Sequence, residues 1–200
     1  MAGPEARLIA LADRRRAAAA LASGFAEDPV WCWLAGTDDT ERRLARYWRA
    51  VMDLATSDGT KVAAYVAGDA DAVAVWRPVD RWKVSTGELV RVFPSLLGGL
   101  RHHLVRSLSL LSAMEAVHPA EPHHYLEFVA THRDRQGQGL GAAVLQPALD
   151  QADDEGVGAY LESSNPKNIA FYARFGFTER DIIEGRRGGP PVFPMWRDPR

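Results

Sequence analysis

The fold is decided by the stretch His132–Ala142, whose sequence is HRDRQGQGLGA. The apolar, β-forming run Tyr125–Ala130 before it predicts a strand, and the segment Leu140–Ala152 after it predicts a helix. The glycines therefore lie where a strand turns into a helix. The first turn of a helix has unpaired N–H groups and a positive dipole end, and glycines let backbone approach an anion closely. The stretch therefore predicts a phosphate or pyrophosphate site.

Length and composition indicate one domain over residues 1–200. A chain of 200 residues with 46% hydrophobic content fills one good core. No window approaches 18 to 20 uncharged apolar residues, so we expect no transmembrane helix. The N-terminus lacks the basic and apolar regions of a secretory signal. Cys32 is the single cysteine, which excludes an internal disulfide, and we expect a cytoplasmic protein.

Charge and spacing also limit the partners. The net charge of −2 argues against binding to nucleic acid through bulk electrostatics, and we expect neither a nucleic-acid nor a membrane partner. The pairs His102-His103 and His123-His124 have no acidic or histidine partner at helical ligand spacing, so we expect no metal. We expect a monomer or a homodimer.

The order of elements predicts a mixed α/β fold with a central, partly antiparallel sheet flanked by helices. The expected strands are 7–12, 61–67, 72–76, 123–131, 159–162, 177–184 and 192–196. The expected helices are 14–25 capped by Asp13, one from Asp38 or Asp39 to Ala55, 140–152, and 169–175 stopped by Gly176. A helical insertion is expected at about 84–117.

Two motifs resemble the signatures of one protein family. Gln136-x-x-Gly139-x-Gly141 resembles the acyl-CoA pyrophosphate motif of the GNAT superfamily of N-acyltransferases. The segment Glu162–Phe177, ESSNPKNIAFYARFGF, resembles the second signature of that superfamily. Within it, the chain is most similar to the antibiotic acetyltransferases typified by puromycin N-acetyltransferase. The shared features are length, the lead-in His118-Pro119-x-Glu121-Pro122, Gln136-Gly137-x-Gly139-Leu140-Gly141, Leu161-Glu162-x-Ser164 and the long helical stretch between the third and fourth strands.

The resemblance implies a GNAT-like acyl-CoA N-acyltransferase fold with acetyl-CoA as co-substrate. It implies that strands splay apart beside the pantetheine arm, which pairs with the backbone of Val129, Ala130 and Thr131. The pyrophosphate would be held around Gln136 by the amides of Gly137, Gln138, Gly139, Leu140, Gly141 and Ala142. Asn165 or Asn168 would contact the pantetheine or the adenylyl side. Tyr172 matches the tyrosine whose phenol lies near the thioester sulfur.

The reaction expected is direct transfer of an acetyl group to a primary amine. The amine must be neutral to attack, so a base must take its proton, and a protonated phenol such as Tyr172 suits the leaving thiolate. Glu127 is the first candidate for the base, with His123 behind it, because it is a carboxylate in an otherwise apolar strand. Side chains alternate between the two faces of the predicted strand 123–131. One face would carry His123, Tyr125, Glu127 and Val129, and the other His124, Leu126, Phe128 and Ala130.

Two other functions fit parts of the sequence. Gly137-x-Gly139-x-x-Ala142, followed by Glu162, fits a dinucleotide-binding fingerprint of an NAD(P)-binding Rossmann-type protein, although too few residues follow for the rest of that fold. A non-catalytic acyl-CoA-binding protein of the same fold is the other alternative. The catalytic residues expected for the enzyme are Tyr172 and Glu127.

The acceptor expected from the resemblance is a small-molecule amine, such as an antibiotic-like compound or an aminonucleoside. A protein N-terminus or lysine remains open at this point. An aromatic acceptor wall is expected from four tryptophans, Trp31, Trp33, Trp76 and Trp82.

Overall fold

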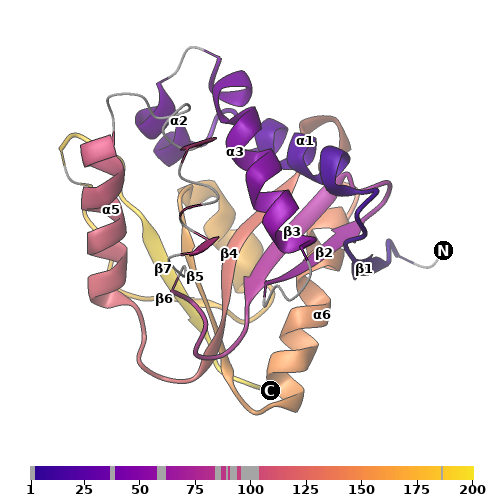
Figure 1. Cartoon of the computed structure of the whole chain (residues 1–200). Helices are drawn as coiled ribbons and strands as arrows, with labels where there is room; N and C mark the ends of the chain where they lie inside the picture. The colour runs from indigo at the N-terminus through magenta and orange to yellow at the C-terminus, as the bar shows by residue number, and fades with distance from the viewer. Residues whose placement is uncertain are drawn as a thin grey trace.

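A mixed seven-stranded sheet forms the centre of the part of the chain that the structure describes. The computed structural model describes residues 3–36, 39–57, 62–83, 87–88, 90, 94–95, 104–185 and 187–200. The strands are β1 (Ala6–Leu8), β2 (Ala63–Ala67), β3 (Ala72–Arg77), β4 (His123–Thr131), β5 (Gly158–Ser163), β6 (Thr178–Glu179) and β7 (Phe193–Arg197). Their order is β1-β2-β3-β4-β5-β7-β6, and the pairs are antiparallel except β4 with β5. The predicted fold class is confirmed (Figure 1).

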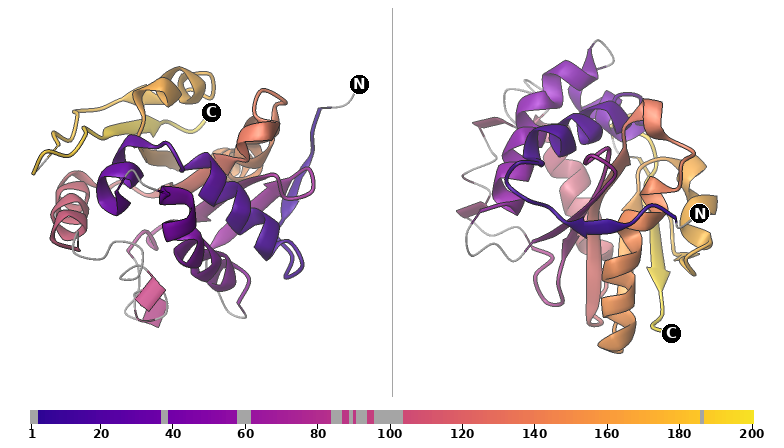
Figure 2. Two further views of the ribbon diagram at one scale, coloured as in Figure 1. Left: turned by 90° about the horizontal axis from the view of Figure 1, so that it is seen from above. Right: turned by 90° about the vertical axis from the view of Figure 1, so that its right-hand side faces the viewer.

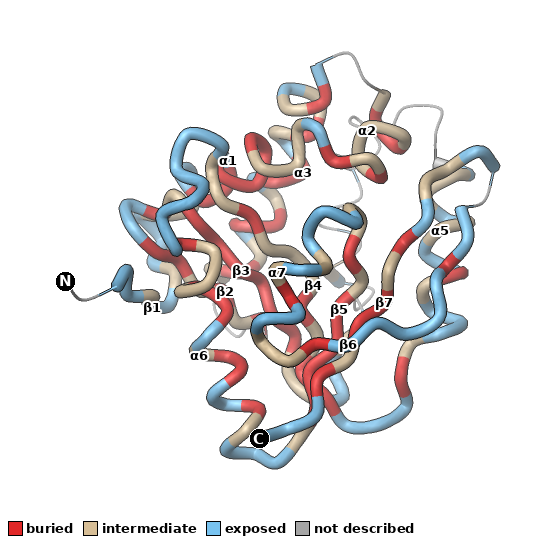
Figure 3. The backbone as a smooth tube through the Cα atoms, turned by 180° about the vertical axis from the view of Figure 1, so that it is seen from behind, coloured by how far each residue is buried: buried red, intermediate tan, exposed pale blue. Residues whose placement is uncertain are grey.

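Helices cover both faces of the sheet, as the views in Figures 1 and 2 show. Helices α1 (Arg14–Gly24) and α3 (Thr40–Ala55) pack on one face, and α6 (Leu140–Asp154) packs on the other. The remaining helices are α2 (Pro29–Ala35), α5 (Leu104–Val117) and α7 (Ile169–Ala173), with short 3-10 turns η2 (Arg133–Arg135) and η3 (Pro166–Asn168). Buried residues follow the strands and the inner helix faces (Figure 3).

Sequence patterns explain most of these elements. In α3 the apolar residues Leu44, Tyr47, Trp48, Val51, Met52 and Ala55 recur at helical spacing, and they are buried in the core between α1, α3 and the sheet. The strands predicted at 61–67 and 72–76 correspond to β2 and β3, which pair in antiparallel register and form a hairpin. The strand 123–131 has the bounds predicted for it. Gly176 has φ +93° just beyond α7, which suits a glycine that ends a helix.

Several boundaries differ from the prediction, and α7, for example, ends at Ala173 rather than at residue 175. The first strand is shorter than 7–12, and the Asp13 side chain does not cap α1; its carboxylate instead accepts hydrogen bonds from Arg7 and from the Ala10 amide. The segment 177–184 forms a strand only at Thr178–Glu179, with an isolated bridge at Ile183. Of the insertion expected at 84–117, α5 is described, and most of residues 84–103 lie outside the described residues.

β4 contains one extra residue, and this corrects the predicted alternation. Val75 of β3 pairs with Phe128, but the next residue, Trp76, pairs with Leu126, so Glu127 forms a β-bulge. The faces exchange at that point. Leu126 packs in the α6 cluster, whereas Phe128 packs on the α1 and α3 cluster. The prediction that these two residues share a face, and that Glu127 shares one with Val129, is therefore wrong.

Candidate active site where β4 and β5 diverge

The two parallel strands separate halfway along their length. β4 and β5 pair from His123 with Gly158 to Leu126 with Leu161, and the register ends there. β4 continues to Thr131, paired only with β3 among the described strands. One edge of its last residues, which include the predicted Val129, Ala130 and Thr131, therefore lacks a described neighbouring strand. This separation of the strands is the arrangement that the family resemblance implied.

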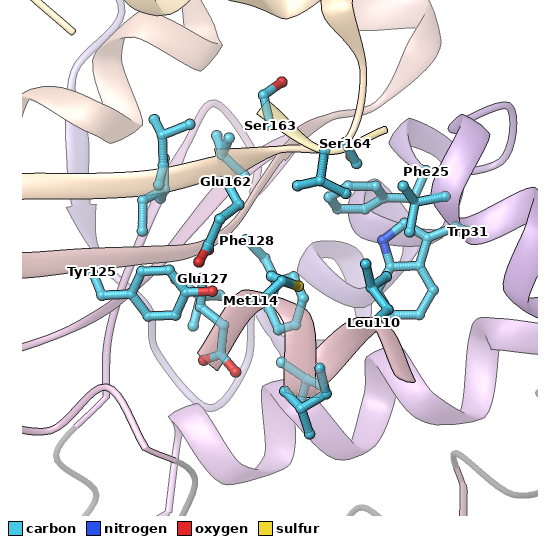
Figure 4. Close-up of a pocket in the computed structure, with 18 of the residues that line it drawn as sticks. Phe25, Trp31, Leu110, Met114, Tyr125, Glu127, Phe128, Glu162, Ser163 and Ser164 are labelled. Carbon is cyan, nitrogen blue, oxygen red and sulfur yellow. The ribbon is translucent and has the colours of Figure 1, made fainter. Parts of the chain in front are cut away.

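A cavity of about 310 Å³ lies at this divergence. Its lining comes from β3, β4 and β5, from α2, α3, α5 and α7, and from Phe25 just after α1, so it collects side chains from both halves of the chain. One end is apolar and aromatic, with Phe25, Trp31, Tyr47 and Phe128 in mutual ring contact at centroid distances of 5.5 to 6.4 Å. The other end carries carboxyl and hydroxyl groups (Figure 4).

The glycine turn has the backbone that an anion site requires. Gly137 and Gly139 have φ of +76° and +78°, which favours glycine, and Gly139 is the N-cap residue immediately before α6. No side chain caps this end of α6, so its first amides are free of a side-chain acceptor. A Cβ on Gly141 would lie 3.2 Å from the Thr131 hydroxyl oxygen. The predicted pyrophosphate residues thus form a small-residue cradle, and acetyl-CoA fits the donors present.

Glu127 reaches the cavity as part of a charged cluster. Arg77, from β3, donates from Nε to Oε2 at 2.7 Å and from Nη2 to Oε1 at 3.3 Å, and it also contacts Glu88 at 3.3 Å. Burial raises the pKa of the Glu127 carboxyl, although the Arg77 guanidinium acts in the opposite direction. The Glu127 side chain is 16% exposed and Arg77 is 5% exposed. Glu127 can therefore face a substrate while Arg77 fixes its position.

Tyr172 also lines the cavity, on the opposite element α7. Burial raises the pKa of its phenol, and the negative charge of Asp28 raises it further. Asp28 caps α2 by accepting from the Val30 and Trp31 amides, and it accepts from the Ser164 hydroxyl at 2.6 Å. A phenol in this environment remains protonated at neutral pH and can donate a hydrogen bond.

The other predicted residues are separated in space. Asn168 lines the cavity, whereas the Asn165 side chain accepts from the Lys167 amide and begins η3. His123 does not line the cavity; its ring is buried and contacts His118. It is therefore not placed to act directly on a substrate there.

The prediction that four tryptophans line the acceptor site is wrong. Trp31 lines the cavity, but Trp76 is buried in the cluster under α6. Trp82 stacks on His118 at 3.7 Å, and Trp33 lies beside Arg106. Trp31 and Trp33 are two positions apart on the short helix α2 and point in different directions. Trp76 and Trp82 belong to a strand and to the loop after it, so nearness in sequence does not bring the four rings together.

Sequence reasoning missed three side chains of the site. Arg77 and Asp28 belong to segments that carry no motif. Glu162 was quoted in the family signature and as a ribose ligand of the dinucleotide alternative, but not as a side chain of the acetyl-transfer site. A buried arginine at the end of a predicted apolar strand was the signal available for Arg77, because such a charge needs a partner.

The comparisons with known proteins decide the family. The model of the "Acetyltransferase (GNAT) family" matches residues 19–177. The chain belongs to this family. It is similar to an uncharacterized N-acetyltransferase of Schizosaccharomyces pombe, with 25% identity over 205 residues that cover 97% of this chain and 83% of the relative. This GNAT protein is therefore an acetyltransferase, and no comparison supports the dinucleotide-binding alternative.

Solved structures share the fold of this GNAT acetyltransferase. One, described as histone acetyltransferase HPA2 and related acetyltransferase from Corynebacterium glutamicum, has a TM-score of 0.70 and 24% identity, covering 100% of this chain and 98% of that one. PaiA N-acetyltransferase from Thermoplasma acidophilum, in complex with coenzyme A, has a TM-score of 0.58 and 10% identity, covering 98% and 99%. At these identities the likeness shows the fold.

Two further observations concern this GNAT acetyltransferase. Among its described residues, no group of three or more His, Cys, Asp and Glu side chains is arranged to hold a metal ion. Within the same described ranges, no helix combines the length and the apolar character needed to cross a membrane.

Proposed function

We propose that this protein transfers an acetyl group from acetyl-CoA to the primary amine of a small molecule by direct attack. The observation that carries the proposal is the cavity at the β4–β5 divergence, which has Glu127 and Tyr172 in its lining. The cavity lies beside the free edge of β4. The glycine turn before α6 follows β4 in the chain. Acetyl-CoA supplies the activated acyl group when it is bound.

The residues proposed to hold acetyl-CoA belong to three segments. The free edge at Val129, Ala130 and Thr131 offers backbone groups to the pantetheine arm. The turn from Gln136 to Ala142 offers amides to the pyrophosphate, and Asn168, with Asn165 beside it, completes the pantetheine side. Support comes from the uncapped α6 terminus and from the coenzyme A complex of the PaiA relative.

Two side chains are proposed as the general base and as the hydrogen-bond donor to the leaving thiolate. Glu127 takes the proton of the acceptor ammonium group, which is the role of a base whose pKa burial has raised. Tyr172 donates a hydrogen bond to the leaving sulfur, because burial and Asp28 keep its phenol protonated. No covalent bond to the protein is needed.

The acceptor we propose is a primary amine on an apolar, ring-containing body, the class to which aminonucleoside and antibiotic-like amines belong. The aromatic end of the cavity suits the body, through Phe25, Trp31 and Phe128. The carboxyl group of Glu127 suits an ammonium group, because Arg77 is shared between Glu127 and Glu88 and leaves an excess of negative charge. The resemblance to puromycin-type acetyltransferases points to the same class.

Calorimetry on two variants of one residue tests the donor site. Gln138 is exposed between the two glycines of positive φ. Gln138→Glu places a carboxylate beside the proposed pyrophosphate and should weaken acetyl-CoA binding at least about tenfold at low salt, through like-charge repulsion. Gln138→Leu removes the amide without adding charge and should bind nearly as the wild type. Equal binding by the wild type and both variants would place the anion site elsewhere.

A screen of primary amines, with release of free thiol as the readout, tests the acceptor. We expect amines with an aromatic body to be acetylated in preference to aliphatic polyamines. The opposite preference would contradict the proposed class.

A further inference from the structure

Glu162 is a buried carboxyl group that has no role in the proposed reaction. It lies on β5, and its side chain is 1% exposed. Both of its oxygens are buried, and their described polar neighbours are the phenols of Tyr125 and Tyr160 and the His118 ring. An isolated carboxylate in such surroundings is strongly destabilising. Hydrogen bonds from the phenols of Tyr125 and Tyr160, together with a shared proton or a nearby positive charge, compensate it.

Two histidines lie in line behind Glu162. His118 Nδ1 is 3.6 Å from Glu162 Oε1, and His118 Nε2 is 3.0 Å from His123 Nε2. His123 Nδ1 is 2.6 Å from the Glu121 carbonyl oxygen. Trp82 stacks on the His118 ring at 3.7 Å and covers it. The three groups form a continuous line from the cavity lining to the chain segment before β4.

The carbonyl at the end of this line fixes the hydrogens. A carbonyl only accepts, so His123 Nδ1 carries a hydrogen, and a neutral His123 ring then presents Nε2 as an acceptor. His118 must donate to it from Nε2. His118 Nδ1 then faces Glu162 as a bare acceptor unless one more proton is present. With two neutral rings and an ionised Glu162, lone pairs of His118 Nδ1 and of the carboxylate face each other. One additional proton in the line removes this repulsion.

That additional proton can lie on any of three groups. It makes Glu162 a carboxylic acid, or His118 an imidazolium, or His123 an imidazolium with His118 donating to Glu162 from Nδ1. Each place differs from the next by transfers along contacts that already exist. Burial lowers the pKa of the His123 ring, although its hydrogen bond to Glu121 acts in the opposite direction.

Tyr125 joins this line to the cavity. Its hydroxyl points toward the carboxyl groups of both Glu162 and Glu127 (Figure 4). Burial raises the pKa of Tyr125 well above its ordinary value, and the charges of Glu162 and Glu127 raise it further. The phenol thus keeps its hydrogen, and it can accept one proton while it donates its own.

We propose that Tyr125, Glu162, His118 and His123 form a proton outlet that returns Glu127 to its basic form after each transfer. This inference rests on the proposed function. The ammonium N–H bond breaks and Glu127 gains the proton. Glu127 gives it to the Tyr125 oxygen as Tyr125 gives its own hydrogen to Glu162, and the stored proton moves through His118 and His123 to water near Glu121. An ammonium acceptor releases one net proton in this way, and no electrons are transferred.

Imidazole nitrogen NMR on the free protein tests the outlet without any substrate. We expect a Glu162→Gln variant, which keeps the shape but cannot carry the proton, to change the protonation and the pH titration of His118 and His123. The other titratable or charged groups facing this line are Tyr125 and Glu127 from β4, Tyr160 from β5, and Arg180. Titrations of both histidines that match the wild type would overturn the proposal.

Kinetics with two matched probes give a second readout. 2-Phenylethylamine is an ammonium ion at neutral pH, whereas O-benzylhydroxylamine has the same shape and a neutral amino group. A neutral amine gives its proton to the leaving thiolate and needs no outlet. Glu162→Gln should therefore lower kcat for the first probe about 100-fold and affect the second much less, with KM for acetyl-CoA unchanged. Equal slowing of both probes would overturn the proposal.

His124→Gln is the matched control. His124 is the neighbour of His123 on β4, but it faces away from the line and contacts Glu155 at 2.7 Å. This variant should leave the kinetics of both probes and the His118 spectrum as in the wild type. If acetyl-CoA does not bind, or neither probe is acetylated, the proposed function fails, and the nitrogen spectra alone decide on the outlet.

Discussion

Tyr172 shows how much chemistry depends on the surroundings of a single side chain. It was predicted from the spacing of its motif, and in the structure it lines the cavity beside the Asp28 carboxylate. Tyr172→Phe removes one hydroxyl from a well-packed ring. We expect turnover to fall by about 10- to 100-fold with the acetyl-CoA affinity unchanged, because only the donor to the leaving sulfur is lost. Thiol release and calorimetry measure the two quantities.

Tyr65→Phe is the control for that experiment. Tyr65 lies on β2 and does not line the cavity, so its hydroxyl has no part in the proposed chemistry. If Tyr172→Phe turned over as fast as Tyr65→Phe, the role of Tyr172 would be packing alone.

The residues that the sequence did not reveal are those whose partners are distant in the chain. Glu127 was predicted as the base, but its ion pair with Arg77 joins residues 50 positions apart. Asp28 contacts Ser164 across 136 positions. A motif records spacing within one segment, whereas these contacts depend on which strands become neighbours, and that information is spread over the whole chain.

At the scale of elements, local patterns were sufficient where local physics determines the structure. The bounds of β4 were predicted to the residue, because Pro122 precedes it and the glycine turn follows its apolar run. The bulge at Glu127 was not predicted. An extra residue is visible only against the register of the partner strand β3, and it reverses the faces beyond it.

Helix α2 gives a test of how one cap supports the site. Asp28 caps this seven-residue helix and also binds Ser164 beside the cavity. Asp28→Ala should lower the free energy of unfolding by about 1 to 2 kcal/mol, because two amides and one hydroxyl lose their acceptor. Asp28→Asn keeps an oxygen for the amides and a polar group for Ser164, so it should cost much less.

Urea unfolding of the two Asp28 variants measures this difference. Equal losses of stability in both variants would show that the charge of Asp28, rather than its capping geometry, is what the fold requires.

At the scale of the whole molecule, the site exists because the sheet opens at one end and is held closed at the other. Below the divergence, β4 and β5 pair over four residues, and β7 then covers the far side of β5. Arg197 of β7 is 4% exposed and binds Asp153 at the end of α6 through two contacts of 2.6 and 2.7 Å. This ion pair joins the C-terminal strands to the helix that begins at the glycine turn.

Stability should therefore depend on pH through Asp153. The hydrogen bonds from Arg197 lower the pKa of the Asp153 carboxyl below its ordinary value near 4. An acid whose pKa is lower in the folded state stabilises the fold above its unfolded pKa, and that contribution is lost as pH falls through the folded pKa. At pH 7, Asp153→Asn should lower the free energy of unfolding by about 2 kcal/mol, because Arg197 stays buried without its charge partner.

Below about pH 4 the difference between the wild type and Asp153→Asn should shrink, because the wild-type carboxyl also becomes neutral. The exposed neighbour Asp154 provides the matched control, since Asp154→Asn changes the same charge on the same helix without touching Arg197. Urea unfolding of the three proteins at pH 7 and pH 3 measures the effect. A constant difference between the wild type and Asp153→Asn at both pH values would show that the ion pair does not hold the closed end of the sheet.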